Sequence, residues 1–208
     1  MLSIHAQALH LGMDVISVNK TPYALSVEPD GKAKQDPEER RERDYINKVF
    51  KAIFEGREHV RGTVGADLGV PITLLRILGD EHKSISLKGC MSGTLGYTVS
   101  ELDKGKRLSE AVNDAVIIGY TETKPFDDYS GRDVLNKILI LWRMIATRSG
   151  IDINNCEIEH SSFIQPAVDR YNQDNAAKFD LESAAKLKGD AFVERIRELD
   201  ASFDKIRS

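Results

Sequence analysis

The chain has 208 residues, of which 41% are hydrophobic, enough to build a core for one domain or slightly more. Its 29 basic and 33 acidic residues give a net charge of −4, and outside residues 38–43 no basic run stands out, which argues against nucleic acid as a partner. Cys90 and Cys156 form neither a disulfide framework nor a metal-site motif, as expected in a reducing compartment.

The first 25 residues are typical of a helix followed by a strand. Apolar side chains recur from Leu2 to Leu11 before Gly12, and the β-branched stretch 13–18 predicts a buried strand. The N-terminus lacks the apolar core of a signal peptide, and no apolar run approaches the roughly 18 residues that a membrane helix requires. We therefore expect a cytoplasmic protein with no membrane partner, in which residues 1–25 end an α/β unit.

A charged segment follows. Residues 28–44 contain no apolar side chain larger than Ala33, so they predict a solvated loop that runs into a helix from about Pro37. From Tyr45 to Phe54 the apolar residues are spaced by three and four, which indicates an amphipathic helix. Residues 26–60 are therefore interpreted as an insertion made of a loop and a helix.

Residues 61–208 are expected to form one further domain in which helices outnumber strands. The expected elements are, in chain order, a helix at 71–78, a strand at 84–88, and helices that open at Ser92 or span 108–116, 131–146 and 192–206. Cys90, directly after the strand, is expected in the core. Because helices separate the strand signals, the predicted class is α+β, a mixed β-sheet with helices packed on it.

Residues 119–137 place four carboxylates and two lysines on a segment that leads into a buried helix. If that helix starts near Ser130, Asp133 and Lys137 lie one turn apart on one face. An isolated pair of this kind is worth only about 0.3–0.5 kcal/mol on an exposed surface. The preceding loop holds three more carboxylates, Glu122, Asp127 and Asp128. Since like charges repel unless a cation or ligand holds them, this segment can bind an ammonium group and move a proton.

The same segment resembles the signature of homoserine dehydrogenases. The matching positions are Ala115, Gly119-Tyr120-Thr121-Glu122, Pro125, Asp127-Asp128, Gly131, Asp133 and Lys137. Three further stretches resemble motifs of that family in the same order, namely residues 18–20, 63–66 and 89–95. The resemblance implies reversible oxidation of L-homoserine to L-aspartate 4-semialdehyde with NAD or NADP, in the synthesis of threonine, methionine and isoleucine. It also implies a homodimer.

The resemblance assigns roles to individual residues. It implies that Lys137 and Lys20 are catalytic, and that Lys20 also contacts the cofactor. Glu122 and Asp133 would bind the amino and hydroxyl ends of the substrate, with support from Asp128. A lysine becomes a better base when a second ammonium and partial burial lower its pKa.

Two residues of the helix that opens after Ser92 complete the implied site. Its first N–H groups, at Gly93 and Thr94, suit a cofactor phosphate or a substrate carboxylate. No metal site is expected, because Arg61 stands where some family members place a glutamate that helps to hold a monovalent cation.

The chain also departs from the family pattern. Tyr129 replaces a small aliphatic residue, Lys124 replaces Asp or Asn, and no G-x-G-x-x-G follows a strand anywhere. We therefore expect either a fragment of an enzyme whose dinucleotide-binding domain survives only in residues 1–25, or a natural short chain. The alternative function is a non-catalytic amino-acid-binding or oligomerisation module. Retention of both Lys20 and Lys137 favours the enzyme, because such a module needs neither.

Overall fold

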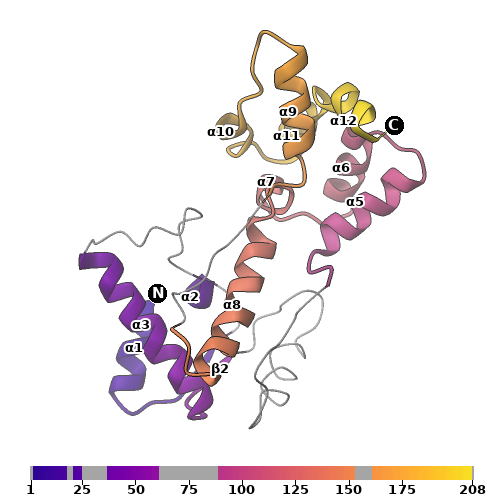
Figure 1. Ribbon diagram of the computed structural model, residues 1–208. Coiled ribbons are helices and arrows are strands. Elements are labelled where there is room, and N and C mark those ends of the chain that lie inside the picture. Colours follow the sequence, from indigo (N-terminus) through magenta and orange to yellow (C-terminus); the bar gives the residue numbers. More distant parts are fainter. Residues whose placement is uncertain (1, 18–20, 25–36, 61–88, 153–160, 208) are drawn as a thin grey trace. The chain divides into compact units, whose positions relative to one another are not determined.

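A computed structural model describes residues 2–17, 21–24, 37–60, 89–152 and 161–207 (Figure 1). The chain divides into two compact units, each built from two separate stretches. The first unit combines Met1–Met91 with Leu135–Glu159, and the second combines Ser92–Val134 with His160–Ser208. None of the described helices is long and apolar enough to span a membrane.

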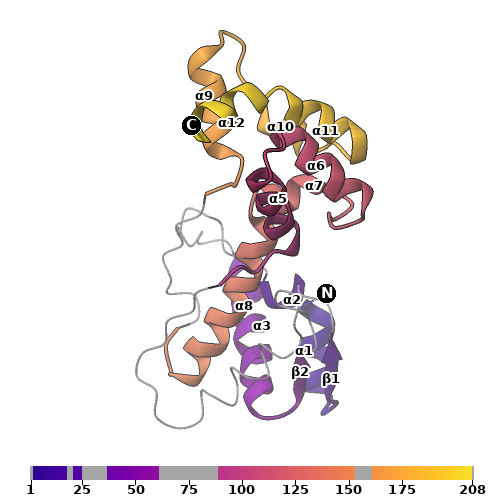
Figure 2. The same ribbon diagram turned by 90° about the vertical axis from the view of Figure 1, so that its right-hand side faces the viewer.

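The first unit contains the parallel strand pair. Its elements are α1 (Leu2–His10), β1 (Val15–Ser17), α2 (Thr21–Ala24), α3 (Pro37–Phe54), β2 (Glu58–Val60) and most of α8 (Arg132–Arg148). In the sheet, Val15 lies opposite Glu58 and Ser17 opposite Val60. Helices α1 and α3 pack side by side next to these strands (Figure 2).

The core of the first unit is formed largely by α3 and α8. The spacing predicted for α3 is confirmed, because Ile46, Val49 and Phe50 are fully buried. From α8 the core receives Leu141 and its neighbours, whereas Ile138 is 47% exposed. The buried face of α8 also carries two basic residues, Lys137 and Arg143.

The regular elements described in the second unit are all helices. Its elements are α5 (Gly93–Asp103), α6 (Leu108–Ile117), α7 (Pro125–Tyr129), α9 (Gln165–Asp174), α10 (Leu181–Ala184), α11 (Gly189–Arg197) and α12 (Asp200–Arg207). Helix α6 packs against α5 and α11, and α9 packs against α12 (Figure 1). Their shared core includes the fully buried Leu108, Tyr129 and Phe192.

The described residues are mostly helical with a small parallel sheet, which agrees with the α+β class. The strand predicted at 13–18 starts at Val15 and is not buried, since Ile16 is 74% exposed, and Cys90 is exposed, not buried in the core. The helix at 71–78 and the strand at 84–88 lie outside the described residues. A mixed sheet, a Rossmann remnant in residues 1–25 and the three-part domain division remain predictions.

The single last helix predicted over 192–206 is wrong, because the chain forms α11 and α12 instead. Helix α12 starts at Asp200, whose carboxylate is 7% exposed and reaches the start of α6. There the backbone N–H and the hydroxyl of Ser109 donate to Asp200 Oδ1 and Oδ2 at 2.8 and 2.6 Å. A carboxylate at a helix N-terminus satisfies N–H groups that lack an intrahelical acceptor. Asp200, at the start of α12, is therefore bonded to Ser109 at the start of α6, 91 residues earlier in the sequence.

Replacing Asp200 with alanine should lower the free energy of unfolding by about 2–4 kcal/mol. The substitution leaves the buried N–H and hydroxyl of Ser109 without this acceptor. Urea unfolding measures the loss, with Asp204→Ala, an exposed position on the same helix, as the control. Equal stability of the two variants would contradict the capping role of Asp200.

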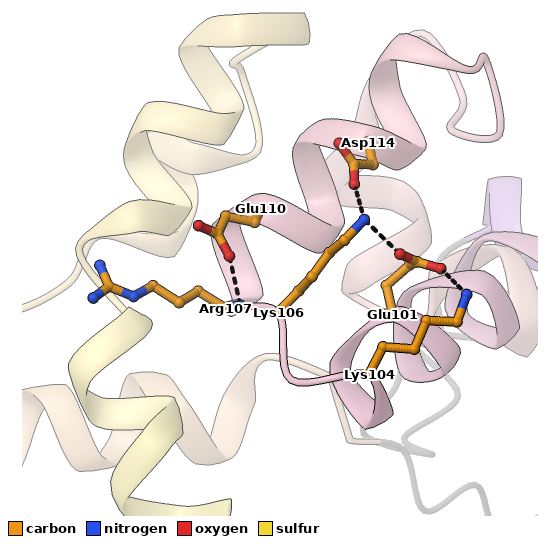
Figure 3. A network of polar contacts seen from close by, with 6 residues as sticks. All are labelled: Glu101, Lys104, Lys106, Arg107, Glu110 and Asp114. Atoms are coloured by element: carbon orange, nitrogen blue, oxygen red, sulfur yellow. Dashed lines mark hydrogen bonds and ion pairs between the residues drawn. The ribbon is translucent and has the colours of Figure 1, made fainter.

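An ion-pair network joins the end of α5 to α6 (Figure 3). The two oxygens of Glu101 accept from Lys104 and Lys106 at 2.5 Å, and Lys106 also reaches Asp114 at 2.5 Å. The hydrogen bond from Lys104, followed by that from Lys106, lowers the pKa of Glu101. Between the two helices Gly105 adopts a φ of 92°, a left-handed conformation that glycine adopts without strain.

The lowered pKa of Glu101 predicts a pH-dependent contribution to stability. A carboxylate with a lowered folded-state pKa adds stability above its ordinary value of 4.5 and loses it as the pH falls through the folded-state value. Glu101→Gln should therefore melt at a lower temperature than the wild type at pH 7, and the difference should vanish in acid. Thermal melts across this pH range test it, with the exposed Asp103→Asn as the control. A difference that is constant with pH would contradict the ionic origin.

Candidate active site

The first part of the candidate site is the start of α5. Ser92 Oγ accepts the N–H of Leu95 at 3.1 Å, so the helix begins at Gly93 as predicted. The hydroxyl of Thr94 is buried and lies 2.6 Å from the carbonyl oxygen of Tyr120 and 3.0 Å from Asp128 Oδ1. Gly93 is exposed, and a Cβ added there would meet nothing within 4 Å. The helix start therefore leaves room for a ligand beside Gly93.

Asp128 organises the loop between α6 and α7. Its side chain is 4% exposed, with Oδ1 beside Thr94 and Oδ2 accepting the backbone N–H of Glu122 at 2.8 Å. The side chain of Glu122 is exposed. Asp128 therefore fixes the backbone of Glu122, whose own carboxylate stays accessible to a ligand.

The electrostatics of this cluster favour binding of a cation. Burial, the largest cause, raises the pKa of Asp128, whereas the hydrogen bonds from the N–H of Glu122 and the hydroxyl of Thr94 lower it. The negative charges of Asp133 and Glu122 raise it further. Asp133 is half-buried in the first turn of α8. The second unit thus gathers Thr94 and three carboxylates, whose mutual repulsion an ammonium group would relieve.

Lys137 follows Asp133 by four positions in α8 and belongs to the first unit. It is 7% exposed, and its Nζ donates to the carbonyl oxygen of Met91 at 2.7 Å. Met91 directly precedes Ser92, the capping residue of α5. A lysine is seldom buried to this extent without partners, so Lys137 is held in a defined position and is a candidate acid or base.

Lys20, the second predicted catalytic lysine, lies outside the described residues. The short helix α2 begins at the next residue, Thr21. Within the first unit, Arg143 Nη1 donates to the carbonyl oxygen of Tyr23 at 2.6 Å and so ties α8 to α2. The helix that carries Lys137 is therefore fixed to the helix that starts beside Lys20.

A supporting contact at this site was not predicted from the sequence. The hydroxyl of Tyr129 lies 2.8 Å from Thr98 Oγ1, and Thr98 donates to the carbonyl oxygen of Thr94 at 2.9 Å. Tyr129 is fully buried and stacks on Phe192. The signal in the sequence was the spacing of Thr94 and Thr98, one turn apart on α5. Tyr129, noted only as a departure from the family pattern, thus supports the turn that carries Thr94.

Among the residues that the structure describes, no group of three or more His, Cys, Asp and Glu side chains could hold a metal ion.

The structure places the residues predicted for the site as follows. Thr94, Glu122, Asp128 and Asp133 come together in the second unit, and Lys137 is buried in the first. Their roles in binding and catalysis remain predictions.

Comparison with known proteins identifies the family. The family model described as homoserine dehydrogenase matches residues 72–200. A bifunctional aspartokinase/homoserine dehydrogenase of Buchnera aphidicola is 36% identical over 118 residues, 56% of this chain and 14% of the relative. A homoserine dehydrogenase of Emericella nidulans is 33% identical over 114 residues, 51% of this chain and 30% of the relative.

A third relative extends the match along the chain. The bifunctional aspartokinase/homoserine dehydrogenase of Haemophilus influenzae is 30% identical over 159 residues, 75% of this chain and 17% of the relative. The chain thus spans less than a third of the length of each of these three relatives. No solved structure matches it. Because the family model covers more than half of the sequence, the chain belongs to the homoserine dehydrogenase family.

Proposed function

We propose that this chain carries the substrate-binding and catalytic residues of an NAD(P)-dependent homoserine dehydrogenase. It would interconvert L-homoserine and L-aspartate 4-semialdehyde in threonine, methionine and isoleucine synthesis, as a cytoplasmic homodimer. The observation that carries the proposal is the cluster of Thr94, Glu122, Asp128 and Asp133, followed four positions later by the buried Lys137. The cluster falls within the residues that the family model matches.

The carboxylates suit the polar ends of an amino alcohol. In the proposed complex, the exposed carboxylate of Glu122 accepts hydrogen bonds from the substrate ammonium, and Asp133 binds the hydroxyl end. Asp128 holds the backbone N–H of Glu122 at 2.8 Å and so keeps this loop in place. Charge-assisted hydrogen bonds of this kind are about twice as strong as neutral ones and orient the substrate.

Lys137 is the proposed base. It removes the proton of the substrate hydroxyl as the carbon that bears it is oxidised, and in the reverse direction it returns that proton to the aldehyde oxygen. Lys20 is proposed as the second catalytic lysine. Lysine suits this role because burial and neighbouring charge adjust its proton affinity more readily than that of arginine.

A nicotinamide cofactor, when bound, would supply the hydride acceptor for the oxidation of L-homoserine. The described residues fit only a small part of it, at the exposed Gly93 and the first turn of α5, where N–H groups can meet a phosphate. The sequence has no glycine-rich fingerprint after a strand that would hold the rest of the dinucleotide. The proposed roles of Lys137 and the carboxylates do not depend on a nucleotide site within this chain.

Calorimetric titration of L-homoserine into the full chain tests the proposal, together with formation of reduced NAD or NADP. We expect saturable binding that weakens with L-2-aminobutyrate, which lacks the hydroxyl, and with the Glu122→Gln variant. Glu182→Gln, an exposed position on α10, is the control. Failure of L-homoserine to bind would refute the proposal. Binding without turnover would mean a substrate-binding domain that lacks a nucleotide site of its own.

A further inference from the structure

The hydroxyl of Thr94 faces two acceptors with a single hydrogen. The carbonyl oxygen of Tyr120 lies 2.6 Å away and Asp128 Oδ1 lies 3.0 Å away. The hydroxyl can donate to only one of them in full, and the nearer one, the carbonyl oxygen of Tyr120, can only accept, so it is satisfied when the hydrogen turns away from Asp128. An ionised Asp128 would then present a negative oxygen to a lone pair of Thr94, whereas a protonated Asp128 donates to it. When Asp128 Oδ1 carries a proton, the carbonyl oxygen of Tyr120, the hydroxyl of Thr94 and Asp128 Oδ1 therefore all have a hydrogen-bond partner.

The other oxygen of Asp128 leads to the same assignment. Oδ2 accepts the N–H of Glu122 at 2.8 Å, which is compatible with a neutral carboxyl group that donates through Oδ1. The whole side chain is 4% exposed, so little water reaches it to stabilise a charge. An ionised Asp128 would compete with the carbonyl oxygen of Tyr120 for the single hydrogen of Thr94, whereas a neutral Asp128 donates its own hydrogen to Thr94.

In the part of the chain that the structure describes, no basic side chain bonds Asp128. Glu122 in the preceding loop and Asp133 in α8 are both acidic and disfavour its ionisation. Asp127 is paired with Arg132 at 3.9 Å, and Lys124 is exposed. On the packed helices α5 and α11 several charged groups bond each other: Glu101 with Lys104 and Lys106, Arg195 with Glu198, and Arg197 with Glu194. The remaining charged residues there, Asp103 and Asp190, are exposed acids.

We infer that Asp128 keeps its proton to a higher pH in the ligand-free chain than in the complex, and releases it to solvent when the ammonium group of an amino acid binds beside Glu122. This inference rests on the proposed function, because it takes L-homoserine as the ligand. On binding, the Oδ1–H bond breaks, the proton passes to the buffer, and the new carboxylate charge is balanced by the ammonium. The hydrogen of Thr94 can then turn toward Asp128 Oδ1, at 3.0 Å.

The inferred coupling between ligand binding and proton release from Asp128 has a defined sign. Because binding releases a proton, L-homoserine should bind more weakly as the pH falls. Its dissociation constant should rise by up to about tenfold per pH unit below the pKa of Asp128 in the free chain. Well above that pKa, Asp128 is already ionised and the affinity should no longer change through this residue.

The ligand-free chain gives the first test. Carboxyl-carbon NMR follows each aspartate through a pH titration, and the resonance absent from Asp128→Asn identifies Asp128. We expect Asp128 to titrate at a clearly higher pH than a free aspartate, because its side chain is buried. Titration of Asp128 at the ordinary pH of an aspartate would overturn the inference whether or not homoserine binds.

Calorimetry in buffers of different ionisation enthalpy gives the second test, because the slope counts the protons released. At mildly acidic pH we expect release approaching roughly one proton per L-homoserine bound, as one carboxyl group ionises. Asp128→Asn should abolish the release and Asp127→Asn should retain it. Equal release from the wild type and Asp128→Asn, or binding without release at any pH, would overturn the coupling. No binding of L-homoserine would overturn the proposed function, and the coupling with it.

Discussion

Replacing Lys137 with methionine should lower the turnover of L-homoserine by about 10²–10⁴-fold, the usual contribution of a general base. Methionine keeps most of the volume of this buried side chain but has no proton-accepting nitrogen. The bond from Nζ to the carbonyl oxygen of Met91 is also lost, which should cost about 0.5–1.5 kcal/mol of stability. Turnover is measured as reduced cofactor, and binding of L-homoserine by calorimetry.

The Lys137→Arg variant separates charge from proton transfer. Arginine keeps the positive charge but stays protonated, so it cannot act as a base at working pH. We expect Lys137→Arg to retain L-homoserine binding within a few-fold and to lose turnover as Lys137→Met does. Lys186→Met, an exposed position outside the site, should match the wild type. An active Lys137→Arg enzyme would show that Lys137 supplies charge and that another group takes the proton.

The helices could be predicted wherever their signals are local. The apolar spacing of α3 and α6 and the capping Ser92 lie within a few residues of the elements they define. Residues 119–137 of the candidate site were found for the same reason, because Glu122, Asp128 and Asp133 are neighbours in sequence. Their link to Thr94 comes from the fold, since 34 residues separate Thr94 from Asp128.

The features that sequence analysis missed depend on distant contacts. The break between α11 and α12 follows from the bonds of Asp200 to Ser109, and apolar periodicity continues across it. The contact of Lys137 with the carbonyl oxygen of Met91 involves the backbone, for which no residue type serves as a signal. Tyr129 could be recognised as unusual, but its bond to Thr98 required the packing of α7 against α5.

Arg143 is, like Lys137, a buried cation of the first unit, and its surroundings explain why it is needed there. It is fully buried, and its Nη1 donates to the carbonyl oxygen of Tyr23 at 2.6 Å. The hydroxyl of Tyr23 in turn donates to Glu58 Oε1 at 2.6 Å, and burial followed by the effect of Glu58 raises the pKa of Tyr23 far above its usual value. Tyr23 therefore stays neutral and connects α2, through Glu58, to the start of β2.

Arg143→Ala should lower the free energy of unfolding by about 3–5 kcal/mol, because it removes a large buried side chain and leaves the carbonyl oxygen of Tyr23 without this donor. Arg148→Ala, an exposed arginine in the last turn of the same helix, should cost less than about 1 kcal/mol. Urea unfolding compares the two. Since Arg143 ties the helix that carries Lys137 to the one that starts beside Lys20, turnover should fall with Arg143→Ala even where the variant is still folded. A variant as stable and active as Arg148→Ala would show that α8 is held in place without this contact.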